Sequence, residues 1–303
     1  MRRLVFFFLL AVACVVPARG QRLAIDLISR DTSYLPNETL VVGVRIKNQS
    51  GQAVILAQED QWVDFLVANS DEQPVPRVGV PAGGEVFVLA AGKEAVKWFN
   101  LAPHFDLSRP GPYDIHAQVR VPQWKEFIPA RPARVNVVRG VTVAELKHGV
   151  PAEKLTDPPE MRVYTLQKVR HVRYVLLYLR VEGEESRRVY SVEPLGRLVA
   201  VSRPEYQMDR HGRLHVLFQN GAKTFSHCLA DADGRMKTAH TYYYGTRRPV
   251  LTVDAEGETG VLGGKRIVTA NDWPPPPTLP QAKRRPLPSD TLPRTLRDRL
   301  RQR

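Results

Sequence analysis

Short segments with alternating apolar and polar residues constrain the fold of this chain most strongly. Eight of them lie between residues 22 and 139, separated by Pro, Gly, Asn and Asp: LAIDLISRD, ETLVVGVRIKNQSG, AVILA, WVDFLVANSD, GEVFVLAAG, EAVKWFNL, GPYDIHAQVRV and ARVNVV. A period of two is typical of a strand with one buried face. It is clearest in two sets: Leu40, Val42, Val44 and Ile46, and Tyr113, Ile115, Ala117 and Val119. So many short strands in about 118 residues predict an antiparallel β-sandwich over residues 21–139.

The segment DLSRPGPYDIHAQVRV adds a family resemblance to this prediction. A Pro-Gly-Pro turn leads into Tyr113 at the start of a strand, which resembles the tyrosine corner of immunoglobulin-like domains without their disulfide. SYLPNETLVVGVRIKNQSGQAVIL is similar to the opening of bacterial immunoglobulin-like domains, and the order of the Asn turn, an aromatic residue and Gly-x-Tyr is similar to that of bacterial proteinase-inhibitor domains. The resemblance implies the fold, and it leaves protease inhibition through a loop such as Pro74 to Gly84 as an alternative function.

The N-terminus, MRRLVFFFLLAVACVVPARGQ, predicts a secretory signal peptide over residues 1–20. Two arginines precede an apolar stretch from Leu4 to Val16, and small residues precede a cleavage point before Gln21. Two alternatives are twin-arginine export through Arg2-Arg3 and a lipid anchor on Cys14. The signal peptide predicts export, and no later segment is long and apolar enough to cross a bilayer. We therefore expect an exported protein that is periplasmic, at the cell surface or extracellular.

Cysteine count and charge limit the class of protein further. Removal of Cys14 with the signal leaves Cys228 alone, so the mature chain forms no internal disulfide and must be held by ordinary hydrophobic cores. The net charge of +13 comes from 33 Arg and 11 Lys against 31 acidic residues. Such a charge suits anionic envelope polymers, lipid head groups or nucleic acid. No nucleic-acid partner is expected, because no nucleic-acid-binding motif accompanies the charge.

The rest of the chain divides into three parts. Residues 140–160 are interpreted as an interdomain connector in which Val143 to His148 form one or two helical turns. Residues 161–270 are predicted to form a second antiparallel β module. Residues 271–303 contain eight prolines and eight basic residues. We expect this part to be a disordered tail that contacts an envelope protein or an anionic polymer.

A repeated acidic-x-x-Gly pattern punctuates the second module. It occurs at Glu193–Gly196, Asp209–Gly212, Asp231–Gly234 and Asp254–Gly257, with spacings of 16, 22 and 23 residues. The acidic side chain suits the first position of a turn and Gly the left-handed position, so each interval is predicted to be about one hairpin. These turns, with LHVLFQ, KTFSHCL and TYYYGTRRPVLTV, resemble hairpin units of β-propellers. The whole pattern resembles exported bacterial proteins with an immunoglobulin-like N-terminal domain, which implies location and architecture but no chemistry.

One of these intervals, DRHGRLHVLFQNGAKTFSHCLADADGRM, tests whether the chain holds a metal or catalytic site. With Asn220-Gly221 as a two-residue loop, Leu214 faces His227, and His227 points away from His215. This register brings together only His215 and Cys228, and two ligands do not make a metal site. We therefore expect no metal and no cofactor, and we keep an enzyme with a site near His215 and Cys228 as a second alternative.

These observations predict an exported, non-catalytic binding or scaffolding protein of the bacterial cell envelope. No catalytic sequence motif is present. Unless the tyrosines simply pack the sheet, the residues expected to contact a partner are Trp124, Phe127, Tyr242, Tyr243, Tyr244, Arg247 and Arg248.

Overall fold

The structure is a computed structural model that describes residues 22–151 and 159–274. It is an all-β protein with several antiparallel sheets, and its described residues contain no α-helix, only a short 3₁₀ turn at Pro122–Trp124. None of the described residues belongs to a helix that could span a membrane. The chain divides into two units, Met1–Val141 and Thr142–Arg303. The predicted signal peptide and all of the predicted tail beyond Pro274 lie outside the described residues.

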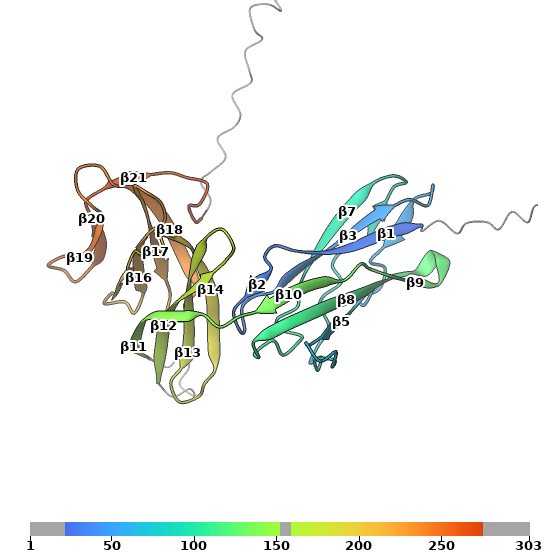
Figure 1. Ribbon diagram of the computed structural model, residues 1–303, viewed down its shortest axis with the longest axis horizontal. Helices are drawn as coiled ribbons and strands as arrows, with labels where there is room; N and C mark the ends of the chain where they lie inside the picture. The colour runs from blue at the N-terminus through green and yellow to red at the C-terminus, as the bar shows by residue number, and fades with distance from the viewer. Residues whose placement is uncertain (1–21, 152–158, 275–303) are drawn as a thin grey trace, which may run out of the picture. The chain divides into compact units, whose positions relative to one another are not determined.

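The N-terminal unit contains two main sheets (Figure 1), and all eight predicted segments form strands in it. One sheet has the order β1 (Leu23–Ser29), β3 (Val41–Asn48) and β7 (Glu94–Asn100). The other has the order β2 (Ser33–Tyr34), β10 (Ala133–Val137), β8 (Gly111–Val121) and β5 (Val63–Ala68), with β9 (Glu126–Pro129) also paired to β8. A small third sheet joins β4 (Val54–Leu56) to β6 (Phe87–Leu89).

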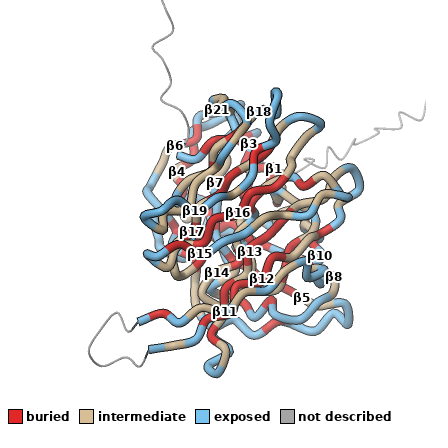
Figure 2. Tube along the Cα trace, turned by 90° about the vertical axis from the view of Figure 1, so that its left-hand side faces the viewer, coloured by how far each residue is buried: buried red, intermediate tan, exposed pale blue. Residues whose placement is uncertain are grey.

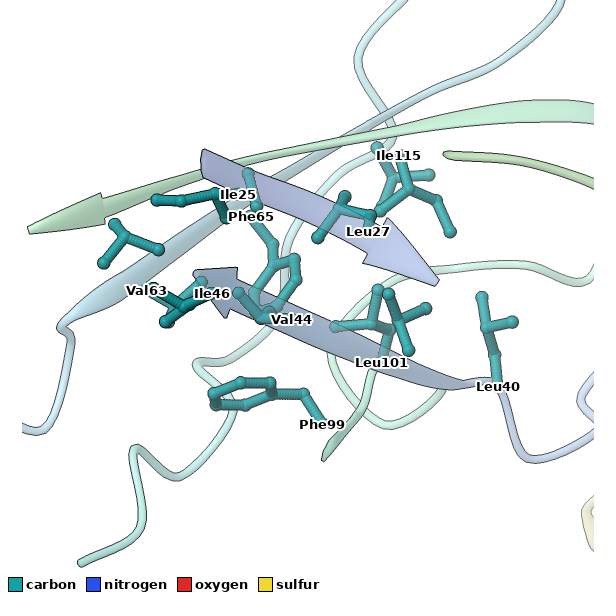
Figure 3. Close-up of a cluster of buried hydrophobic side chains, with 14 of the residues drawn as sticks. Ile25, Leu27, Leu40, Val44, Ile46, Val63, Phe65, Phe99, Leu101 and Ile115 are labelled. Carbon is teal, nitrogen blue, oxygen red and sulfur yellow. The ribbon is translucent and has the colours of Figure 1, made fainter. Parts of the chain in front are cut away.

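The two main sheets share one hydrophobic core, as the alternation predicts. Side chains from β1, β3, β5 and β8 point toward one another in it, with Phe65 among them (Figure 3). Both alternating sets are buried, from fully buried Val42 to 7% exposed Ala117. Burial of each large apolar side chain contributes roughly 1.5–3 kcal/mol relative to its exposure to water. At the start of β8, the Tyr113 hydroxyl donates a hydrogen bond to the Arg109 carbonyl (2.8 Å).

The C-terminal unit also contains two main sheets and a separate hairpin. The first sheet runs β11 (Val141–Val150), β12 (Glu160–Arg170), β13 (Val175–Gly183) and β14 (Val189–Leu198). The second runs β15 (Glu205–Met208), β16 (Leu214–Gln219), β17 (Thr224–Ala230), β18 (Met236–Tyr243) and β21 (Lys265–Ile267). The hairpin joins β19 (Val250–Val253) to β20 (Thr259–Leu262). One core joins the two main sheets, and buried stretches follow their strands (Figure 2).

The predicted helical turn in the connector is wrong, because residues 141–150 form strand β11 beside β12. Ala144 and Leu146, two residues apart, pack against the core of the C-terminal unit. The residues around Glu145 are good helix formers, but hydrogen bonding to the next strand, β12, decides the conformation.

Three of the four predicted acidic-x-x-Gly turns have the same geometry. At Asp231–Gly234, the Asp231 carboxylate accepts the amide hydrogens of Asp233 (3.0 Å) and Arg235 (2.9 Å), and Gly234 has a φ of 81°. Equivalent bonds form in the turns that begin at Asp209 and Asp254. The prediction of a fourth turn at Glu193–Gly196 is wrong, because these residues lie inside β14, where its pairing with β13 has a bulge between Pro194 and Gly196.

The hydrogen-bonded structure of the C-terminal unit extends past residue 270. Trp273 pairs with Ala239 of β18 through two backbone hydrogen bonds of 2.8 and 2.9 Å. Asp272 is buried and forms an ion pair with Arg266 (2.5 Å). The first residues of the predicted tail therefore belong to the sheet.

Candidate functional site

The pairing of β16 with β17 differs from the predicted register. Val216 lies opposite Cys228 and Leu217 opposite His227, so the expected pairing of Leu214 with His227 is wrong. The Asn220 amide donates to the Thr224 carbonyl (3.0 Å), which makes the loop wider than the Asn-Gly pair alone. Because the shift between the two registers is an odd number of residues, it moves every side chain of one strand to the other face.

This shift brings His215 and His227 together and separates His215 from Cys228. The Nδ1 atom of His215 lies 3.0 Å from Nε2 of His227, and the two rings stack with centroids 5.2 Å apart. Cys228 faces the core from the opposite side, with its thiol 3.7 Å from the Leu195 carbonyl. His215 and Cys228, the pair kept as an alternative site, thus lie on opposite faces of the sheet, and burial raises the pKa of the thiol to about 12.

Asp209 extends the histidine pair into a buried chain of three side chains. Its Oδ2 atom lies 3.2 Å from His215 Nε2 and accepts a hydrogen bond from Arg213 Nε (2.6 Å). Burial by itself would raise the pKa of Asp209, but hydrogen bonds from the Arg213 amide and side chain, His215 and the His211 amide lower it to about 2. Asp209 is therefore a carboxylate at neutral pH.

The ionised Asp209 fixes the direction of its own hydrogen bond with His215. A carboxylate only accepts, so His215 Nε2 carries a proton and donates it to Asp209. Burial, followed by the neighbouring His215 and His240, lowers the pKa of His227 to about 4. The other neighbour of His227 is the Tyr242 ring, which it contacts edge-on with ring centroids 6.4 Å apart. His227 is thus a buried, hydrogen-bonded histidine of the sheet.

The β19–β20 hairpin is tied to the turn that begins at Asp209. The Glu258 carboxylate contacts His211 (3.0 Å), Arg210 (2.6 Å) and Arg213 (3.5 Å). Arg210 also donates to the Glu256 carbonyl (2.9 Å). These contacts attach the hairpin to the turn, so the polar residues of the turn have a structural role.

A second group of predicted residues is exposed, and we name these four residues the tyrosine–arginine surface: Tyr243, Tyr244, Arg247 and Arg248. Tyr243 and Tyr244 are 39% and 38% exposed, whereas Tyr242 is half-buried. The Arg248 guanidinium lies 5.3 Å from the centroid of the Phe225 ring and 3.8 Å from Glu205. Aromatic rings with nearby guanidinium groups are typical of recognition surfaces.

The two remaining candidates lie on the N-terminal unit, in different environments. Trp124 is half-buried against the core, with the Arg22 guanidinium 5.2 Å from its ring. Phe127 is 52% exposed, with the Arg120 guanidinium 5.7 Å from its ring. The structure therefore leaves Phe127, but not Trp124, largely open to a partner.

A polar cluster around Arg162 was missed by the sequence reasoning. Arg162 is 7% exposed and bonds the Asp233 carboxylate (2.5 Å) and the Ala232 carbonyl (2.9 Å). The Tyr190 ring stacks on its guanidinium at 3.9 Å, and a polar cavity of about 1150 Å³ opens beside them. A single Arg in an alternating strand gives no signal of this cluster, because Asp233 comes from a turn about 70 residues later.

Over residues 22–151 and 159–274, no group of three or more His, Cys, Asp or Glu side chains converges in a way that could hold a metal ion. The Asp209–His215–His227 chain is linear, since His215 bridges the other two. Its polar atoms point at one another, not at a common point.

Comparison with known proteins gives a distant structural similarity. No protein-family model matches the chain, and no curated protein matches it. A structural match is the crystal structure of Spo0M, a sporulation control protein from Bacillus subtilis, at 12% sequence identity and a TM-score of 0.29. The match covers 55% of this chain and 81% of the Spo0M chain. This chain is an all-β protein with a distant structural similarity to Spo0M.

Proposed function

We propose that this chain is an exported, non-catalytic binding protein of the bacterial cell envelope that holds an anionic polymer on its tyrosine–arginine surface. One observation carries this proposal. The side chains that could perform chemistry, His215, His227 and Cys228, are 4%, 8% and 1% exposed, whereas the aromatic and cationic side chains are open. The net charge of +13 favours a partner of negative charge.

The proposed architecture is an immunoglobulin-like sandwich followed by a module of hairpin repeats. Two sheets around one core and the Tyr113 hydrogen bond to Arg109, four residues upstream, support the first part. Three turns with matching hydrogen bonds, at Asp209, Asp231 and Asp254, support the second. The resemblance to propeller hairpins belongs to this proposal.

Binding of the chain to poly-γ-glutamate tests the proposed function. A variant with Tyr243→Ala, Arg247→Ala and Arg248→Ala should bind at least about tenfold more weakly, since it removes an exposed ring and two guanidinium groups. The matched control, Arg170→Ala with Arg173→Ala, removes two exposed positive charges elsewhere on the same unit. Equal weakening by both variants would show that net charge alone attracts the polymer, and would reject the surface.

The predicted role of residues 271–303 needs its own comparison. A chain that ends at Pro274 keeps Asp272 and Trp273, which belong to the sheet. If the tail contributes a separate contact, this shortened chain binds poly-γ-glutamate more weakly and with a smaller dependence on salt. Unchanged binding would reject the tail as a partner contact.

A protease inhibitor is the second candidate, favoured by the loop from Pro74 to Gly84. Val78 is 78% exposed, but the loop around it is anchored: its own amide donates to the His104 carbonyl (3.0 Å), and Trp62 Nε1 donates to the Gly83 carbonyl (2.7 Å). An exposed side chain on a fixed loop suits a protease cleft. Failure of the chain to slow any of a panel of serine and cysteine proteases would reject this candidate. For a protease that is slowed, Val78→Asp should abolish the effect.

A further inference from the structure

Two adjoining hollows on the N-terminal unit form one groove over the outer face of β5 and β8. Their volumes are about 520 and 550 Å³, and they share Asp64, Arg77 and Gln118. Phe127 lines the first hollow and Leu66 the second. Each volume falls within the range of small-ligand sites.

The strand register explains why this face is polar and open. Asp64 lies opposite Gln118, and Leu66 opposite His116, while the residues between them, such as Phe65, point into the core. The chain after β5 folds back on itself, with the Val75 amide donating to the Val67 carbonyl (2.8 Å). This fold places Arg77 beside the strand face and builds one wall of the groove.

The polar side chains of the groove are held in place but stay accessible. Arg77 forms an ion pair with Asp64 (2.7 Å), and Gln118 donates to the other oxygen of Asp64 (3.2 Å). Arg120 forms an ion pair with Glu59 next to Phe127. The four charged side chains are 36–48% exposed. Exposed ion pairs of this kind contribute little to folding stability, so stability does not account for their arrangement.

The chemistry of the groove identifies a class of ligand. Two arginines face three carboxylates, those of Glu59, Asp60 and Asp64, so the groove is close to neutral in a chain of net charge +13. Carboxylate, amide and guanidinium groups offer fixed acceptors and donors to vicinal hydroxyls. The rings and methyls of Phe127 and Leu66, 52% and 50% exposed, offer apolar surface to the C–H face of a sugar ring.

We propose that this groove binds a short segment of a neutral glycan. The Asp64–Arg77–Gln118 network bonds the hydroxyls of one pyranose ring, and Phe127 packs against the face of a neighbouring ring. A peptide added as an extra strand fits less well, because β8 is paired on both edges and the chain around Pro74 occupies part of the free edge of β5. This site is separate from the tyrosine–arginine surface and does not depend on the function proposed for it.

Isothermal titration of the full chain with three neutral hexasaccharides tests the proposal: cellohexaose, laminarihexaose and chitohexaose. We expect at least one of them to bind. Phe127→Ala and Asp64→Ala should each weaken that binding tenfold or more. The matched control is Trp98→Ala, which removes a 46% exposed ring from the other main sheet of the same unit, and which should leave binding within twofold.

Three outcomes would overturn the proposal. One is that none of the hexasaccharides binds, and another is that Phe127→Ala and Asp64→Ala bind as well as the parent. The third is that a random peptide library selects ligands that depend on Phe127 while the glycans do not bind, which would assign the groove to peptides. Circular dichroism of each variant confirms that a loss of binding is not a loss of fold. Poly-γ-glutamate binding, measured in parallel, should be unchanged by the groove variants, so the two proposals fail independently.

Discussion

The Nδ1 atom of His215 lies 3.0 Å from Nε2 of His227, and this hydrogen bond joins β16 to β17 on the face away from the core. It requires one imidazole to be neutral, because a protonated ring has no acceptor. Burial, followed by the neighbouring His215 and His240, lowers the pKa of His227, so His227 is the ring that stays neutral as the pH falls. The pair therefore makes the C-terminal unit sensitive to acid.

The first prediction concerns this pH dependence. The pKa of His227, about 4 in the folded chain, lies below that of a free imidazole, about 6.5. The unfolded chain thus takes up the proton first as pH falls, and the folded state loses on the order of 3 kcal/mol between pH 6.5 and 4. Asp209, with a pKa lowered to about 2, adds a further loss below about pH 4.

Replacement of His227 by Gln tests this dependence. Gln offers His215 Nδ1 both a donor and an acceptor but does not titrate, so His227→Gln should flatten the fall in stability between pH 6.5 and 4. The measurement is urea denaturation at a series of pH values. If the variant and the parent lose stability in parallel over this interval, His227 is not the group responsible.

The second prediction compares two glycines in equivalent turns. Gly234 and Gly257 have φ values of 81° and 79°. A Cβ on Gly234 would lie 2.4 Å from both Ser191 Oγ and Val181 Cγ2, whereas a Cβ on Gly257 would meet only Arg210 Cδ at 3.9 Å. Gly257→Ala should cost about 1–2 kcal/mol from backbone conformation alone, and Gly234→Ala about 1–3 kcal/mol more from the overlap.

Chemical denaturation of the two alanine variants checks this difference. Gly257→Ala is the matched control, because both substitutions impose the same backbone penalty. Equal loss of stability in the two variants would mean that the turn at Asp231 moves away from β13 and β14 without cost.

The third prediction concerns Cys228. The thiol is buried and its pKa is raised to about 12 by burial, so very little thiolate forms at neutral pH. Iodoacetamide should modify Cys228 in the folded chain orders of magnitude more slowly than in guanidinium, as quantified by mass spectrometry of the peptide that contains it. Rapid labelling of the folded chain would instead indicate a reactive cysteine and revive the enzyme hypothesis.

The fourth prediction concerns Tyr113, whose hydroxyl donates to the Arg109 carbonyl at 2.8 Å. Tyr113→Phe keeps the buried ring and removes this hydrogen bond, so it should cost about 1 kcal/mol of the stability of the N-terminal unit. Tyr206→Phe, at a 39% exposed tyrosine of the C-terminal unit, should cost close to nothing when thermal unfolding is measured. If Tyr113→Phe is as stable as the parent, water bonds the Arg109 carbonyl in place of the hydroxyl.

Local chemistry accounts for the parts of the fold that the sequence predicted. Alternation in β3 and β8 identifies strands because one face of each must leave water. The turn at Asp231 is predictable because the side chain that bonds the amides and the glycine that takes the left-handed conformation lie within four residues. Tyr243 and Tyr244, which are exposed, lie a few residues before two arginines, so this feature too depends only on neighbouring residues.

The sequence by itself thus determined the all-β class, eight of the ten strands of the N-terminal unit and three turns of the C-terminal unit. Only the tertiary structure decided that residues 141–150 form a strand, since β11 depends on its pairing with β12. The tertiary structure also decided that His215 meets His227 and not Cys228. The physical reason is that strand side chains alternate with a period of two. The hydrogen bonds of a wider loop at Asn220 shift the register by an odd number of residues, and such a shift exchanges the two faces of the sheet.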